Sequence, residues 1–127
     1  MGLKLKLLDL DLSIAKVGDF VLTEEKFKKS KFVSITKTED EVSLVIETKY
    51  IDDNWSTSTG WKALMAVGPL DFSLVGIIKE ILEILADAGV SVFTISTYDT
   101  DYILVQDSQL SLALEKLKVK FQLDLPA

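Results

Sequence analysis

The chain has 127 residues, 48% of them hydrophobic, enough for one ordinary domain or two very small modules. Twenty Asp and Glu against fourteen Lys and Arg give a net charge of −6, which argues against nucleic-acid or anionic-membrane partners. No Cys and no His are present, which excludes disulfides, thiolate metal sites, cysteine nucleophiles and histidine-based triads. We therefore expect a binding protein without metal or cofactor rather than an enzyme. The absence of a signal-peptide pattern and of a run of about 20 apolar residues predicts a cytoplasmic location.

The first half of the chain predicts strands and one short helix. Four alternating or β-branched segments are typical of strands: residues 3–7, 12–17, 32–37 and 42–47. Thr23, followed by two acidic residues, is a candidate N-cap of the short helix. The polar run 52–60 predicts a loop, and we place a domain boundary there, between an incomplete module at 1–58 and a complete one at 59–127.

The second half alternates more regularly between strand and helix patterns. Apolar residues at three- and four-residue spacing predict a helix over 74–88 that ends at Gly89, and Ser108 is a candidate cap of a second helix. The predicted strands are residues 61–67, 90–98, 102–105 and 119–125. The order strand, helix, strand, strand, helix, strand indicates an α+β, ferredoxin-like fold: four antiparallel strands with two helices on one face.

An internal repeat suggests that the two halves are related. Residues 32–45 match residues 92–105 at a constant offset of 60, with identical residues at 35 and 95, 44 and 104, and 45 and 105. The first copy has a short helix and no clear closing helix and strand. We therefore expect a tandem arrangement in which the N-terminal module is degenerate.

The turn between the predicted strand 61–67 and the following helix is a candidate ligand loop. A glycine there allows close approach to a ligand, and a helix N-terminus offers free N–H groups to a carboxylate. The loop consists of Gly68, Pro69, Leu70, Asp71, Phe72 and Ser73. The alternative is a simple strand–helix turn in which Asp71 only caps the helix.

A polar strand and an acidic turn offer further candidates. Thr94, Ile95, Ser96 and Thr97 alternate polar and apolar residues, so hydroxyl groups on one face are available to a small polar ligand. Asp99 and Asp101 flank the turn that follows and are suited to an ammonium group or a divalent metal. The alternative is that the hydroxyl residues only favour a strand and the acids only form a turn.

The segments Trp61–Leu64, Gly68–Ser73 and Gly89–Val105 resemble the ACT domain family. The run Ile95-Ser96-Thr97-Tyr98-Asp99-Thr100-Asp101-Tyr102 is similar to that of small stand-alone bacterial proteins with tandem ACT-like modules. That subgroup is related to the ACT modules of aspartate kinases and of the eukaryotic cytosolic arginine sensors. The resemblance covers residues 61–118 and, more weakly, residues 1–50.

This resemblance implies a regulatory or sensor protein that binds a small molecule, usually an amino acid, at the glycine-containing loop and the module interface. The implied site comprises residues 68–73, the strand residues 94–97, and Asp99 and Asp101. Edge strands and a site between modules make a homodimer the expected oligomeric state. The first-module counterpart of the loop, which we place at Leu8–Asp11, has no glycine, so a second equivalent site is open to question. The alternative function is a ligand-free protein–protein interaction module.

Overall fold

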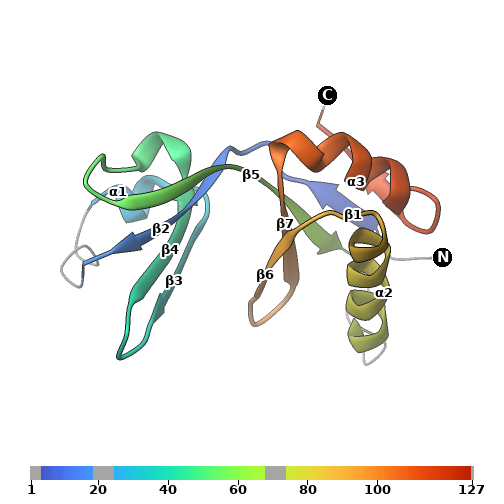
Figure 1. Ribbon diagram of the computed structural model, residues 1–127, viewed down its shortest axis with the longest axis horizontal. Helices are drawn as coiled ribbons and strands as arrows, with labels where there is room; N and C mark the ends of the chain where they lie inside the picture. Colours follow the sequence, from blue (N-terminus) through green and yellow to red (C-terminus); the bar gives the residue numbers. More distant parts are fainter. Residues whose placement is uncertain (1–3, 19–24, 68–73, 127) are drawn as a thin grey trace. The chain divides into compact units, whose positions relative to one another are not determined.

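The computed structural model describes residues 4–18, 25–67 and 74–126, and divides the chain into two compact units (Figure 1). One unit combines Met1–Asp9 with Lys62–Ala127, and we call it the discontinuous unit. The other, Leu10–Trp61, interrupts the first in sequence, and we call it the inserted unit. This division differs from the expected domains 1–58 and 59–127 mainly at the N-terminus, because the first strand pairs with strands of the second half.

The discontinuous unit contains the predicted strand–helix–strand–strand–helix–strand order. Its elements are β1 (Lys4–Leu7), the second half of β5 (Ser56–Val67), α2 (Leu74–Asp87), β6 (Val92–Ser96), β7 (Asp101–Gln106), the 3-10 turn η3 (Asp107–Gln109), α3 (Leu110–Leu117) and β8 (Gln122–Asp124). The α+β, ferredoxin-like class is thus confirmed. The expected four-stranded antiparallel sheet was wrong in one respect: β1 lies between β5 and β8, antiparallel to the first and parallel to the second.

Both helices of this unit cover the same face of its sheet. One face of this sheet is buried, and the side chains on it come from alternate positions of β5 and β7 and from one residue of β1: Leu64, Ala66, Ile103, Val105 and Leu5. They form one core cluster with residues from the two helices and the segments that follow them: Ile81, Leu85, Val90, Ala113, Leu117 and Phe121. Burial of these apolar surfaces is the main force that holds α2 and α3 on the sheet.

The end of α2 is formed by Gly89, as the sequence predicts. Gly89 has φ +76°, a conformation that costs glycine little. Its N–H donates to the Ala86 carbonyl at 3.0 Å, and the Val90 N–H donates to the Leu85 carbonyl at 2.9 Å. These two bonds are the Schellman pattern, which satisfies carbonyl groups at the helix end and directs Val90 into the core.

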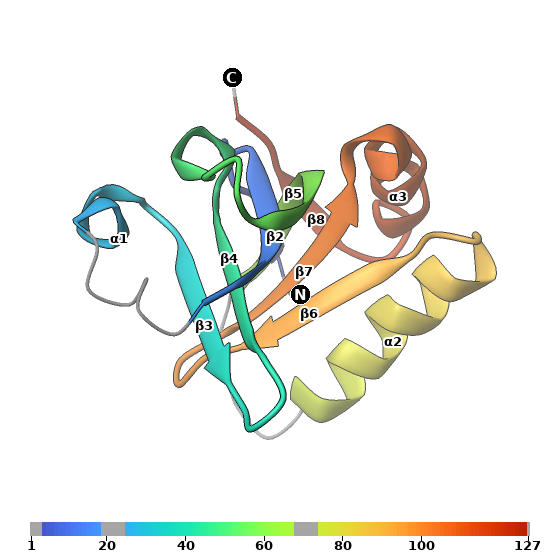
Figure 2. The same ribbon diagram turned by 60° about the vertical axis from the view of Figure 1, so that its left-hand side comes forward.

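The inserted unit contains β2 (Leu12–Val17), α1 (Lys26–Lys29), β3 (Val33–Lys37), β4 (Val42–Glu47), the 3-10 turn η2 (Thr48–Tyr50) and the first half of β5. Its strands are ordered β3, β4, β2, β5, and Figure 2 shows the β3–β4 hairpin in cyan and green. β1 and β2 are consecutive in the chain but are not neighbours in the sheet. Instead β1 pairs with residues 64–67 of β5, and β2 pairs with residues 56–61 of the same strand.

The segment 56–60, expected to be a loop, forms the first five residues of β5. Thr57 and Ser58 pair with Ala15 and Ile14, so strand pairing outweighs the weak local preference of a Ser, Thr and Gly sequence. The register shifts between Leu12 and Ile14, and Gly60 in this irregularity has φ +81°. A glycine is suited to such a β-bulge because it reaches positive φ without strain.

The two units share a strand–turn–strand–3-10 segment, with a register different from the expected one. The turns that begin at Thr38 and Thr97 have the same backbone hydrogen bond, and η2 and η3 begin at Thr48 and Asp107, so the offset is 59 (97 − 38) and not 60. A shift of one residue moves strand side chains to the other face of the sheet. The identical residues at an offset of 60 therefore do not occupy equivalent positions in the two units. α3 follows η3, whereas β5 is the next element after η2, as expected of a degenerate first copy.

Two smaller expectations also differ from the structure. Ser108 does not cap α3; it lies in η3, and the N-cap position is Gln109, which makes no side-chain capping bond. The last strand spans only Gln122–Asp124, because a turn at the end of α3 occupies residues 118–121. The candidate cap Thr23 lies outside the described residues.

Candidate functional site

The predicted ligand loop, residues 68–73, lies outside the described residues. Its two flanking elements are described: β5 ends at Val67 and α2 begins at Leu74. In chain order, residues 68–73 therefore stand between a strand and a helix, as the sequence predicts. The roles of Gly68, Pro69, Leu70, Asp71, Phe72 and Ser73 stay predictions.

Of the predicted strand residues, Thr94, Ile95 and Ser96 lie on β6, whereas Thr97 belongs to the turn that follows. β6 pairs with β7 and has no other strand partner in the described part of the discontinuous unit. Thr94 and Ser96 are exposed, whereas Ile95 between them is half-buried. The alternation is therefore present, with hydroxyl groups facing solvent. β6 thus offers exposed hydroxyl groups on the outer strand of this unit's sheet.

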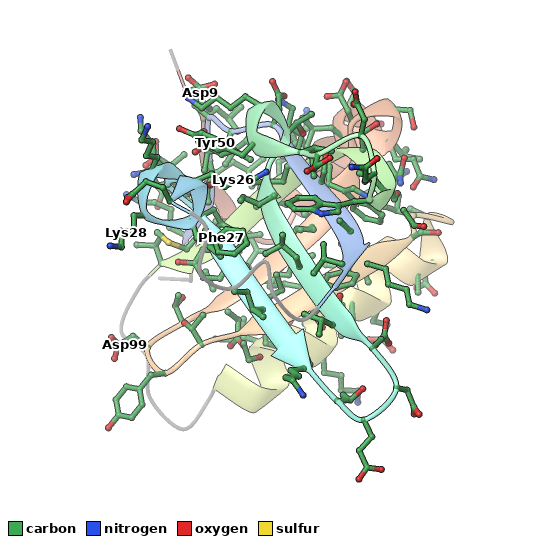
Figure 3. All side chains as sticks on the ribbon, turned by 90° about the vertical axis from the view of Figure 1, so that its left-hand side faces the viewer. Asp9, Lys26, Phe27, Lys28, Tyr50 and Asp99 are labelled. Carbon is green, nitrogen blue, oxygen red and sulfur yellow. The ribbon has the colours of Figure 1, made fainter. Side chains whose placement is uncertain are left out.

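The β6–β7 turn brings four predicted residues together. Ser96 and Asp101 are cross-strand partners, and the Ser96 hydroxyl donates to the Asp101 carboxylate. The Thr97 N–H donates to the Thr100 carbonyl at 2.8 Å, and the Thr97 hydroxyl donates to the same carbonyl at 3.1 Å. Asp99 is exposed at the tip of the turn, where Figure 3 labels it. A carboxylate at this position is accessible to a cationic group in solution.

One residue of this turn was missed by sequence reasoning. The hydroxyl of Thr100 donates to the main-chain carbonyl of Ala66 at 2.7 Å and so connects the turn to the end of β5. Thr100 lies between Asp99 and Asp101, the two acidic residues that made this turn a candidate site. Its role depends on the pairing of β5 with β7, which the local sequence does not specify.

Our placement of the first-module counterpart of the glycine loop does not match the order of the described elements. The strand that precedes the first helix is β2, which ends at Val17 and is followed by Gly18, just as Gly68 follows Val67. Leu8–Asp11 instead connects β1 to β2. The absence of a glycine in that connection therefore says nothing about a site in the inserted unit.

A basic and aromatic cluster near α1 belongs to the inserted unit. Figure 3 shows Lys26 and Tyr50 near each other, and the Lys26 ammonium donates to the Tyr50 carbonyl at 3.2 Å. The same ammonium lies 4.5 Å from the centre of the Trp55 ring, a cation–π contact. Lys26 is thus engaged within the protein and holds α1 against the segment after η2.

Two surface grooves lie along the helices of the discontinuous unit. One of about 310 Å³ is lined by Ile84, Asp87, Ala88, Lys116, Val119 and Lys120. The other, of about 690 Å³, is lined by residues of α3 and the C-terminal segment: Ser111, Leu114, Glu115, Lys116, Lys118, Val119, Leu123 and Leu125. None of the described candidate residues lines either groove.

Within residues 4–18, 25–67 and 74–126, no group of three or more His, Cys, Asp or Glu side chains is arranged to hold a metal ion. In the same ranges, no helix is both long enough and apolar enough to cross a membrane.

Comparison with known proteins relates this chain to the ACT domain family. The family model for the ACT domain matches residues 56–119, which include β5, α2, β6, β7 and α3. The chain is 27% identical, over 88% of its length, to the cytosolic arginine sensor for mTORC1 subunit 1 of Mus musculus. It spans 39% of the length of that relative.

Solved structures support the same fold. The X-ray structure of the Agobacterium tumefaciens protein Atu0741 has a TM-score of 0.90 and 29% identity, and the match covers 100% of this chain and 96% of that one. The regulatory subunit of aspartate kinase from Thermus thermophilus has a TM-score of 0.66 at 11% identity, covering 96% and 99% of the two chains. At that identity the second likeness concerns the fold alone.

Proposed function

Because the chain belongs to the ACT domain family, we propose that it is a regulatory protein that binds an amino acid at the discontinuous unit. The ligand would lie against residues 68–73 and the β6–β7 segment, with Asp99 or Asp71 binding its ammonium group. The observation that carries this proposal is the β6–β7 turn, in which Ser96, Thr97 and Asp99 are exposed polar residues within four positions of the chain. The likeness to a protein named as an arginine sensor supports an amino acid as the ligand class.

The chemistry of the site fits an amino acid better than a phosphate. Main-chain N–H groups of a strand–helix loop suit a carboxylate, and the nearby acids suit an ammonium or guanidinium group. A phosphate would meet Asp99 and Asp101, which repel anions. The proposal includes a non-enzymatic role, a cytoplasmic location and a homodimer.

A thermal-shift screen of the purified chain against the twenty amino acids tests this proposal. A ligand at about 100 times its Kd adds about 2.7 kcal/mol to stability, which raises Tm by roughly 5–10 °C for a chain of this size. We expect one or a few amino acids to produce such a shift, with L-arginine the first to test. Isothermal titration then gives the Kd. A flat response to all twenty amino acids contradicts the proposal.

Two variants locate the site. Gly68→Val and Asp99→Asn are both expected to weaken or abolish the ligand-induced shift. Asp40→Asn is the matched control, because Asp40 occupies the equivalent position of the β3–β4 turn at the offset of 59 (99 − 40) and is also exposed. Equal ligand responses in the Asp99→Asn and Asp40→Asn variants would remove Asp99 from the site.

A ligand-free interaction module is the second candidate function. The observation that favours it is the apolar surface of the larger groove, where Val119 is 78% exposed and Leu125 is 49% exposed. Side chains of this kind at a protein surface are typical of contact sites for other proteins. This function predicts association with another chain and no response to metabolites. Val119→Ser should then reduce association without changing the Tm.

A further inference from the structure

The smaller of the two grooves in the discontinuous unit has walls of opposite charge. It lies between α2 and α3, which Figure 1 shows side by side. One wall comes from the end of α2 and the other from the end of α3 and the turn after it: Ile84, Asp87 and Ala88, and Lys116, Val119 and Lys120. The α2 wall therefore presents an acidic residue, whereas the α3 wall presents two lysines.

The charges on the two walls are available to a second molecule. Asp87 and Lys116 are exposed, and neither makes an ion pair within residues 4–18, 25–67 and 74–126. Lys120 pairs with Glu80 at 3.4 Å, but the two side chains are 59% and 42% exposed, so the pair is weak. Opposite charges that line one groove without pairing to each other are suited to charges on a partner.

An apolar strip lies between these charges. Val119 is 78% exposed on the α3 wall, and Ile84 and Ala88 are half-buried on the α2 wall. Val119 also lines the larger groove, so it lies where the two grooves meet. An exposed apolar centre with a charged border is the composition of a protein contact site.

We propose that a second copy of the chain binds at this groove, related to the first by a twofold axis that runs along the groove. This inference rests on the homodimer of the proposed function and gives it an interface. Rotation about that axis exchanges the two walls, so the α2 wall of one protomer faces the α3 wall of its partner. Asp87 then meets the partner's Lys116, and Val119 meets the partner's Ile84. Each contact occurs twice in the dimer.

The distribution of charge favours a second copy over a partner of one sign. A purely acidic partner is repelled by Asp87 and a purely basic one by Lys116, whereas the groove itself supplies both charges in the required order. The charges also select the orientation, because an axis across the groove would place Asp87 opposite the partner's Asp87. Since each chain has a net charge of −6, two copies repel at long range, and association requires such local pairing of opposite charges.

The test measures the dimer Kd of the full chain by sedimentation equilibrium at low salt. Lys116→Glu places an acid on both walls and Asp87→Lys places lysines on both, so neither variant can pair well with itself. An equimolar mixture of the two variants restores opposite charges across the interface. Lys79→Glu is the matched control, because Lys79 is an exposed lysine of α2 that does not line the groove. Thermal unfolding checks that every variant is folded.

We expect each groove variant to raise the dimer Kd by about tenfold or more, because two like-charge contacts replace two pairs. The mixture should return the Kd to within about threefold of the wild-type value, and Lys79→Glu should leave it unchanged. If the wild-type chain is monomeric at every concentration, or if both groove variants dimerise as well as wild type, this interface is refuted. A mixture that stays monomeric refutes the pairing of Asp87 with the partner's Lys116.

The amino-acid screen separates failure of this interface from failure of the proposed ligand. An amino acid that raises the Tm of a monomeric wild-type chain would retain the binding function and remove only the dimer. A dimer that responds to the groove variants but to none of the twenty amino acids would retain the interface and remove the proposed ligand.

Discussion

Replacement of Glu47 would show which of its contacts holds the inserted unit together. Glu47 ends β4 and is 6% exposed. Its Oε2 accepts the Lys31 N–H at 2.7 Å and the Ser30 hydroxyl at 3.2 Å, whereas its Oε1 lies 3.8 Å from the Lys49 ammonium. The carboxylate thus ties the segment before β3 to the end of β4 and also forms an ion pair.

The two kinds of contact differ in expected energy. Hydrogen bonds to a charged group contribute about 1.5–3 kcal/mol, and their loss leaves partly buried donors without an acceptor. The ion pair contributes under about 0.5 kcal/mol, because the Lys49 side chain is 65% exposed and solvent screens its charge. We therefore expect Glu47→Ala to cost about 3 kcal/mol, Glu47→Gln about 1 kcal/mol and Lys49→Ala under about 0.5 kcal/mol.

Urea unfolding followed by tryptophan fluorescence measures these differences. Both tryptophans, Trp55 and Trp61, lie in the inserted unit, so the signal reports on the unit that contains Glu47. Circular dichroism follows the whole chain and shows whether the two units unfold together. If Lys49→Ala costs as much as Glu47→Ala, the ion pair dominates and our reasoning about the backbone contact is wrong.

Two further predictions concern burial in the core and the end of α2. Ile81→Ala should lower the free energy of unfolding in urea by about 2–5 kcal/mol, since Ile81 is fully buried in the core. Ile35→Ala should lower it by under about 1 kcal/mol, because Ile35 is 39% exposed. Equal losses in the two variants would contradict the described core. Gly89→Ala should cost about 1–2 kcal/mol because φ is +76°, although the space for a Cβ is open. Gly89→Asn should cost less, since Asn tolerates this conformation; thermal unfolding compares the two variants.

The sequence predicted the parts of the fold that depend on local pattern. The apolar spacing of α2 and the glycine after it were sufficient to place the helix and its end within one residue. The βαββαβ order followed from the same kind of evidence. These features are set by residues close together in the chain, so a single sequence contains the information.

Errors arose where distant segments decide the structure. Residues 56–60 have a loop-like composition but form a strand, because β2 provides backbone partners for them. β1 was placed in the first module, because its partners β5 and β8 lie 57 or more positions further along the chain. For the candidate site, the exposed residues of β6 and the turn were predictable, whereas the bond from Thr100 to Ala66 depends on strand pairing.

The insertion of one unit within the other has a consequence for the order of folding during synthesis. The inserted unit is contiguous, so all its strands have been made once Trp61 has left the ribosome. β1 is synthesised before the inserted unit, yet one of its edges pairs with residues 64–67 and the other with residues 122–124, so the first edge stays unpaired until residue 67 has been made and the second until residue 124. In the folded discontinuous unit, Leu7 and Leu64 are cross-strand partners, and the Leu8 N–H donates to the Ala63 carbonyl at 2.9 Å. Residues 9 and 62, which would become chain ends if residues 10–61 were removed, therefore follow and precede paired residues of β1 and β5. A short turn between them would give a single-module chain in which β1 is directly followed by its partner β5.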